Sequence, residues 1–261
     1  MIKKDWTNTL LSSPFMKTMA DNLNKSASET DPRTTPLYGE IITHLETDGT
    51  VIDIGAGVGR FAIPLAKEGF NVTAVEPNEE MRKHLLGSIE QNGLTSRINV
   101  IQSSWPVDKD LQADVTFASF VIQFSHDPEK FIHSMEKCTN KRCIVSIHVD
   151  QPLGFLKDIW QVFRSSEPVP AMLTFSDLYP MLLNMGIIAN VAIIEEKRMS
   201  GPVMEPAKII PLLSDLLSIR DKPADMQRLK EILEGMRSRI REPPSMRTAI
   251  VSKPGDDKNE L

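Results

Sequence analysis

The sequence is poor in cysteine and contains no long apolar run. Its two cysteines, Cys138 and Cys143, are spaced too widely for a redox CxxC pair, and too few other ligands accompany them for a zinc site. No apolar run reaches the 18 residues that a membrane-spanning helix needs, and the first residues lack the apolar core of a secretory signal. We therefore expect a cytoplasmic protein without a membrane-bound segment.

Clusters of basic residues are also missing. The net charge is −5, and no Lys/Arg run supplies the basic face that a nucleic-acid partner requires. By contrast, the apolar fraction of 41% and the length of 261 residues are ordinary for one globular α/β domain with additional elements. We expect no nucleic-acid partner.

From residue 50 onward, short β-branched segments alternate with amphipathic ones. This pattern predicts strands followed by helices, which is typical of a parallel sheet with helices on both faces. The ligand crevice of such a sheet lies at the carboxyl ends of its strands. The expected strands are 50–54, 71–75, 98–102, 113–119 and 143–148, and the expected helices are 60–68, 78–92 and 128–138.

The second half of the chain adds more helix than a minimal sheet domain needs. Helices are expected at 153–163 and 175–185, strands at 187–194 and 247–251, and two further amphipathic helices at 206–219 and 223–240. We interpret 151–173 and 203–240 as helical cap elements, and residues 1–35 as an N-terminal lid segment.

The clearest motif is the glycine-rich segment VIDIGAGVGRF at 51–61. A dinucleotide fingerprint, GxGxxG, would need a third glycine where Arg60 stands; the observed spacing is GxGxG. Asp53, two residues before Gly55, would repel a pyrophosphate but suits a ligand with an ammonium group. No Lys-Ser/Thr pair follows, so a Walker-type phosphate loop is excluded.

A second carboxylate follows the next strand. Glu76 lies 21 residues after Gly55, directly after the strand expected at 71–75. A carboxylate at this strand end can accept hydrogen bonds from both hydroxyls of a ribose. The alternative is a solvated charge at the entry to a helix.

Together these residues resemble the class I methyltransferases that depend on S-adenosylmethionine (SAM). VIDIGAGVGRF is similar to the first motif of that family, and VTAVEPNEEM to its second. The resemblance extends over residues 36–150 and more loosely over 174–195. It implies a Rossmann-like, mostly parallel seven-stranded sheet with the last strand antiparallel, and a SAM-binding methyltransferase domain spanning 36–261.

The resemblance also implies roles for single residues. The glycine loop would wrap the methionine part of SAM, Glu76 would hold the ribose, and the residues after the third strand would flank the adenine. Many members carry Asp where Ser104 stands here; Trp105 could compensate by stacking, or could simply pack in the core. The residues predicted to contact SAM are Asp53, Gly55, Ala56, Gly57, Glu76, Pro77, Ser104, Trp105 and Ser119.

Methyl transfer from SAM needs few catalytic groups from the protein. Its methyl group is already activated by the sulfonium, so the protein must align the acceptor and exclude water, without a metal or a nucleophilic side chain. A general base helps where the acceptor carries a proton. His148, at the end of the fifth strand, is the candidate catalytic residue, as a base or as a contact to the acceptor; the alternative is a structural role. A further helix is expected at 36–46, and Arg33 and Tyr38, near its start, are candidates for closing over the SAM carboxylate.

Four hypotheses remain for the activity. A covering segment favours a SAM-dependent methyltransferase with a small-molecule acceptor, which must be enclosed to exclude water. The same chemistry on a protein or RNA partner, and a catalytically silent SAM- or nucleotide-binding module, are the alternatives. An NAD-dependent oxidoreductase is disfavoured by Arg60 and Asp53. The DPPY-like signature of base and glutamine methylation is absent after the fourth strand, where SFVIQF stands at 119–124.

Overall fold

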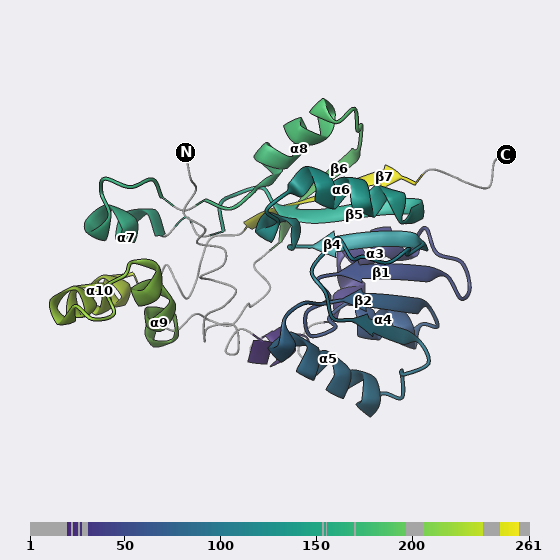
Figure 1. The fold of residues 1–261 in the computed structure, drawn as a ribbon, viewed down its shortest axis with the longest axis horizontal. Coiled ribbons are helices and arrows are strands. Elements are labelled where there is room, and N and C mark those ends of the chain that lie inside the picture. Colours follow the sequence, from purple (N-terminus) through teal and green to yellow (C-terminus); the bar gives the residue numbers. More distant parts are fainter. Residues whose placement is uncertain are drawn as a thin grey trace.

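The computed structural model describes residues 20–21, 23–25, 27, 31–152, 154, 156–169, 171–196, 206–236 and 246–255. Within them a seven-stranded sheet has the order β3-β2-β1-β4-β5-β7-β6 (Figure 1). The first five strands are parallel, and β7 runs antiparallel to both neighbours. The strands are β1 Thr50–Ile54, β2 Asn71–Val75, β3 Ile98–Ile101, β4 Ala113–Ser119, β5 Thr139–His148, β6 Asn190–Glu196 and β7 Met246–Pro254.

Helices cover both faces of the sheet. Successive side chains of a strand point to opposite faces, and accordingly Val51 belongs to one apolar core while Ile52 and Ile54 belong to the other. Helices α3, α4 and α5 pack on the first face, and α6 and α8 on the second. Their bounds are α3 Pro36–Ile42, α4 Ala62–Lys67, α5 Glu79–Gln91, α6 Pro128–Lys137 and α8 Phe175–Asn184.

Three further helices build a separate small core. Helices α7 (Leu156–Phe163), α9 (Pro206–Leu216) and α10 (Pro223–Gly235) lie together beyond one end of the strands (Figure 1). Their shared buried side chains include Trp160, Leu213 and Leu229.

The three-helix group is joined to the sheet at one edge. Strand β5 ends at His148 and leads toward α7, while β6 ends at Glu196 ahead of α9, and β7 begins at Met246 after α10. Because β7 is antiparallel to β5 and β6, all three of these chain ends lie at the carboxyl edge of the parallel strands. The edge that carries the ligand crevice in such sheets is therefore the edge that carries these helices.

The predicted fold is confirmed, with shifts at element boundaries. Helix α4 begins at Ala62 rather than at residue 60, because Gly59 is still in the left-handed region with φ +91°. Strand β5 begins at Thr139, four residues earlier than expected, because its polar first half pairs with β4 and β7. Strand β6 begins at Asn190 rather than at 187, because Ile187 and Ala189 pack into the core before the strand starts.

Parts of the predicted domain division fall outside the described residues. Of the expected lid segment 1–35, residues 1–19, 22, 26 and 28–30 lie outside them. Of the expected cap, residues 153, 155, 170, 203–205 and 237–240 lie outside them. No helix in the described part of the chain is both long and apolar enough to cross a membrane.

Candidate active site

The glycine loop follows β1 and is fixed to the end of the neighbouring strand. Gly55 and Gly57 have φ values of +71° and +57°, a region that glycine adopts without steric cost. The backbone N–H groups of Gly55 and Ala56 both donate to the carbonyl of Val75, at 2.7 and 3.1 Å. The loop therefore turns sharply at the carboxyl ends of β1 and β2.

The two central glycines of the loop have different surroundings. A Cβ at Gly55 would lie 2.4 Å from Cγ2 of Val121, so the segment after β4 presses directly against the loop. A Cβ at Gly57 would meet no atom closer than the Gly55 carbonyl oxygen at 4.0 Å. Gly55 is therefore required by packing, whereas Gly57 leaves open space above the loop.

Glu76 ties this loop to the turn after β2. Its Oε2 accepts a hydrogen bond from the N–H of Gly57 at 2.8 Å, and its Oε1 accepts one from the N–H of Asn78 at 2.7 Å. The Arg82 guanidinium donates to the backbone carbonyls of Glu76, at 3.1 Å, and Pro77. Burial raises the pKa of the Glu76 carboxyl, and the two amide donors counteract part of that rise.

Asp53 lies deeper in the same site. Its side chain is 3% exposed, and its Oδ2 accepts no hydrogen bond from the described residues. Burial, and secondly the charge of Glu76, raise the pKa of the Asp53 carboxyl to about 8, against the opposing effect of the Ala62 amide. Two buried carboxylates thus stand beside a glycine loop with open space above it.

These residues fit SAM. A buried carboxylate oxygen that lacks a donor matches a ligand with an ammonium group, because an unmatched buried polar atom is costly. Each oxygen of Glu76 accepts one backbone hydrogen bond and retains capacity for a ribose hydroxyl. The positive-φ glycines permit close approach of the methionine part.

On the adenine side, the two predicted residues differ. Ser104 is exposed, and its carbonyl accepts a hydrogen bond from the Ser103 hydroxyl at 2.9 Å. Trp105 is half-buried: its indole N–H donates to the Phe131 carbonyl at 3.1 Å, and its ring packs edge-on against the Phe131 ring. The core packing of Trp105 is observed, and its stacking on adenine stays a prediction.

The ends of β4 and β5 bring Ser119 and His148 to the same edge. Ser119 pairs with Ser146 in the last register position of the two strands. Directly after it, Phe120 stacks on His148, with ring centroids 4.3 Å apart and an interplanar angle of 26°. Gln123, in the short 3₁₀ helix η2 (Ile122–Phe124), buries an amide oxygen that accepts no hydrogen bond from the described residues.

Phe120, Val121 and Gln123 were not predicted as site residues. They lie in the segment SFVIQF, which follows the fourth strand at a position where residues for the acceptor chemistry are expected, but Ser119 is its single predicted site residue. The position after a parallel strand was the available signal, because the crevice of this fold lies there. The left-handed backbone of Phe120 gives no sign in the sequence.

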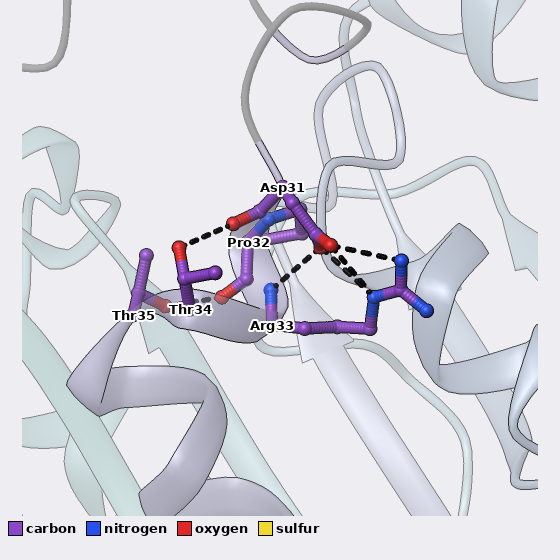
Figure 2. Close-up of polar contacts among 5 residues, drawn as sticks. All are labelled: Asp31, Pro32, Arg33, Thr34 and Thr35. Atoms are coloured by element: carbon purple, nitrogen blue, oxygen red, sulfur yellow. Dashed lines mark hydrogen bonds and ion pairs between the residues drawn. The ribbon is translucent and has the colours of Figure 1, made fainter.

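Arg33 and Tyr38 do not form an open pair above the loop. Figure 2 shows Arg33 turned onto Asp31, with its Nε 2.9 Å from Oδ1 and its Nη2 2.8 Å from Oδ2. This ion pair is exposed and local to the 3₁₀ helix η1 (Pro32–Thr34). Tyr38 lies inside α3, is 1% exposed and belongs to the same apolar core as Ala56. Tyr38 is therefore a core residue of α3 in this structure.

A metal site and a second hollow are the other candidates in the described part of the chain. No group of three or more His, Cys, Asp or Glu that could hold a metal ion occurs among the residues that the structure describes. A shallow hollow lined by residues such as Asn71 and Arg97 lies at the amino ends of β1, β2 and β3, on the edge opposite the glycine loop. It does not contribute to the site.

Comparison with known proteins gives the same picture. Residues 27–169, more than half of the chain, match the family described as Methyltransferase domain. A ubiquinone biosynthesis O-methyltransferase of Rickettsia conorii is 28% identical over 180 residues, which cover 65% of this chain and 59% of that protein. A protein-lysine N-methyltransferase of Saccharolobus islandicus is 34% identical over 86 residues, 32% of this chain and 50% of that protein.

The fold also has counterparts among solved structures. The SAM-dependent methyltransferase of Geobacter sulfurreducens, crystallised with S-adenosylhomocysteine, superposes with a TM-score of 0.56 at 15% identity, covering 90% of this chain and 97% of that one. At this identity the likeness concerns the fold alone. The family match over 27–169 shows that the chain belongs to the methyltransferase-domain family and carries a class I SAM-dependent methyltransferase domain.

Proposed function

We propose that the protein transfers the methyl group of SAM to a small-molecule acceptor. The observation that carries this proposal is the three-helix group of α7, α9 and α10, which is joined to the sheet at the carboxyl edge beside the glycine loop. A helical cover at this edge suits an acceptor that must be enclosed, because methyl transfer requires water to be excluded.

The two cap segments act as one body. The Arg164 guanidinium, just after α7, donates to the Leu217 carbonyl after α9, at 2.7 Å from Nη2 and 3.1 Å from Nε. Trp160 of α7 is 6% exposed and shares a core with Leu213 and Leu229. Burying each such side chain stabilises by about 1.5–3 kcal/mol, so the cap holds together while the acceptor enters.

On the cofactor side, the proposal assigns a task to each part of the loop. Gly55, Ala56 and Gly57 would surround the methionine part, and Asp53 would supply the charge opposite its ammonium group. Glu76 would hold the ribose, with Pro77 fixing the turn that follows. Ser104, Trp105 and Ser119 would line the adenine and sulfonium sides.

When bound, SAM supplies an activated methyl group. The work of the protein is to hold the acceptor in line with the bond that breaks and to accept a proton where the acceptor carries one. His148, at the end of β5 and directly before the chain leaves for the cap, is the proposed proton acceptor. This chemistry needs no covalent bond between the acceptor or SAM and any described residue.

The named relatives support the acceptor class to different extents. The Rickettsia conorii protein, an enzyme of ubiquinone biosynthesis by its name, aligns over 65% of this chain. The protein-lysine methyltransferase aligns over only 32%. The longer alignment favours a small acceptor.

Two measurements test the proposal. Isothermal titration calorimetry with SAM, S-adenosylhomocysteine and NAD should give micromolar binding for the first two and none for NAD. Purified protein with methyl-labelled SAM is then offered the small-molecule fraction and the macromolecular fraction of a cell extract. Label in the small-molecule fraction is expected. Label found solely in protein or RNA would contradict the proposal, and SAM binding without transfer to either fraction would identify a silent module.

A further inference from the structure

The rings of Phe120 and His148 stack on each other at the carboxyl ends of the neighbouring strands β4 and β5. Phe120 directly follows β4 and His148 ends β5. Both side chains are half-buried, so each keeps some surface toward solvent. The Phe120 N–H donates to the Ser146 carbonyl at 2.9 Å, which extends the pairing of the two strands to the base of the stack.

The backbone of Phe120 is held in an unfavourable conformation. Its φ of +55° lies in the left-handed region, which costs a bulky non-glycine residue about 1–2 kcal/mol. Strain of this kind persists where the surroundings impose it, and it is concentrated at functional sites. Here the turn brings the ring of Phe120 over the imidazole of His148.

The next residue fixes the stack relative to the cofactor loop. Val121 packs so closely on Gly55 that a Cβ there would lie 2.4 Å from its Cγ2. Phe120 is therefore the neighbour in sequence of Val121, which contacts the glycine loop. His148, the other ring of the stack, is the last residue of β5 before the chain continues to the cap. Between cofactor loop and cap is where an acceptor must lie.

A buried acceptor of hydrogen bonds is available in the same segment. The Gln123 amide oxygen is shielded from solvent and receives no hydrogen bond from any described residue. An unmatched buried carbonyl costs about 1–3 kcal/mol, so a ligand that brings a donor gains from meeting it. Hydroxyl and amine groups are such donors.

We infer that the acceptor is a planar aromatic compound with a hydroxyl group, and that Phe120 is its specificity-determining residue and positions His148. This inference rests on the proposed function. Aromatic rings prefer offset-stacked or edge-to-face partners, and the half-buried rings of Phe120 and His148 each keep accessible surface for such a contact. In the transfer, the acceptor's oxygen forms a bond to the methyl carbon, the carbon–sulfur bond breaks, and the hydroxyl proton passes to the His148 imidazole. The products are a methyl ether and S-adenosylhomocysteine.

The test uses the full-length protein and four variants. Phe120→Leu keeps an apolar side chain but removes the ring, and Phe120→Tyr restores the ring. His148→Asn removes the proton acceptor. Phe70→Leu is the matched control, since Phe70 is a half-buried ring just before β2, at the opposite edge of the sheet. Circular dichroism and urea unfolding establish that each variant folds.

Steady-state kinetics use catechol and 3,4-dihydroxybenzoate as planar acceptors, with cyclohexane-1,2-diol and sarcosine as non-planar ones. We expect transfer to the planar pair. Phe120→Leu should raise KM for them about three- to tenfold, the value of one lost ring stack, and Phe120→Tyr should return it toward the wild-type value. His148→Asn should lower kcat about a hundredfold or more with a smaller change in KM.

A binding measurement separates positioning from stability. With S-adenosylhomocysteine bound, an NMR titration should give catechol a weaker dissociation constant in Phe120→Leu than in Phe70→Leu. Transfer confined to sarcosine or to the cyclic diol, or identical catechol affinity in the two Phe→Leu variants, would overturn the inference and leave the proposed function standing. If none of the four compounds is methylated, the inference is refuted, and labelling of the extract fractions decides the proposed function by itself.

Discussion

Asp53 is expected to make the stability of the ligand-free enzyme fall as the pH rises. Its carboxyl has a pKa of about 8 in the folded protein against an ordinary 3.8, first because it is buried and then because Glu76 is charged. Between those two values the folded state holds a proton at Asp53 that the unfolded state has released. The free energy of unfolding therefore decreases by about 1.4 kcal/mol for each pH unit across this window from this group alone.

The substitution Asp53→Asn removes this dependence. Between pH 5 and pH 7, the unfolding free energy of the wild type should drop by about 3 kcal/mol more than that of the variant. Urea denaturation at pH 5, 6 and 7 gives the unfolding free energy of each protein as a function of pH. Asp108→Asn, which changes an exposed carboxyl, is the control and should show the same pH dependence as the wild type. If the unfolding free energies of the wild type and Asp53→Asn change equally with pH, the raised pKa of Asp53 is refuted.

Ligand binding should reverse the protonation. An ammonium group beside Asp53 favours the ionised carboxylate, so SAM binding at pH 7 should release close to one proton. Calorimetry in two buffers of different ionisation enthalpy detects this release as a buffer-dependent heat. Asp53→Asn should bind SAM more weakly and without the proton, although it is the more stable protein at pH 7. A buffer-independent heat in the wild type would show that the ammonium group lies elsewhere.

Three further substitutions probe other parts of the site. Gly57→Ala should lose about 1 kcal/mol of stability because of the left-handed backbone at this position. It should bind SAM at least tenfold more weakly, because the added methyl group enters the open space above the loop. Thermal unfolding measures the first effect and calorimetry the second. Gly55→Ala should destabilise more strongly through Val121, and Val121→Ala in the same chain should recover part of the loss; no recovery in the double variant would contradict the contact. Arg164→Met should leave the Leu217 carbonyl without its donor and lower the free energy of unfolding by about 1–3 kcal/mol. Hydrogen exchange in α7 and α9 should become faster, while the SAM affinity stays unchanged. Equal exchange rates in variant and wild type would show that the two cap segments are not coupled.

Local patterns were sufficient to predict much of the sheet and the position of the glycine loop at the end of its first strand. The helices expected at 78–92 and 128–138 begin close to the predicted residues, where the side chains of Asn78 and Asp127 accept backbone hydrogen bonds from Met81 and Lys130. The order of strands and helices followed from the alternation of apolar segments. These features depend on neighbours within a few residues, which a single sequence contains.

The remaining features depend on contacts between distant parts of the chain. The union of α7 with α9 and α10 joins segments more than 40 residues apart, as in the hydrogen bond from Arg164 to Leu217. The polar first half of β5 has no strand-like pattern and is ordered by pairing with β7, as between Arg142 and Pro254. The stack of Phe120 on His148 needs a left-handed backbone that sequence does not predict for phenylalanine.

Under the proposed function, the strand order divides SAM binding and acceptor binding between two halves of the sheet. The glycine loop and Glu76 follow β1 and β2, whereas the chain departs for the three-helix group and returns from it at β5, β6 and β7. Strand β4 separates these halves, and the segment after it is the one that contacts the glycine loop through Val121. Substitutions in residues 151–240 are accordingly expected to change the acceptor that is methylated, while SAM remains the donor. This segment is therefore the one to exchange between related proteins when a new acceptor is sought.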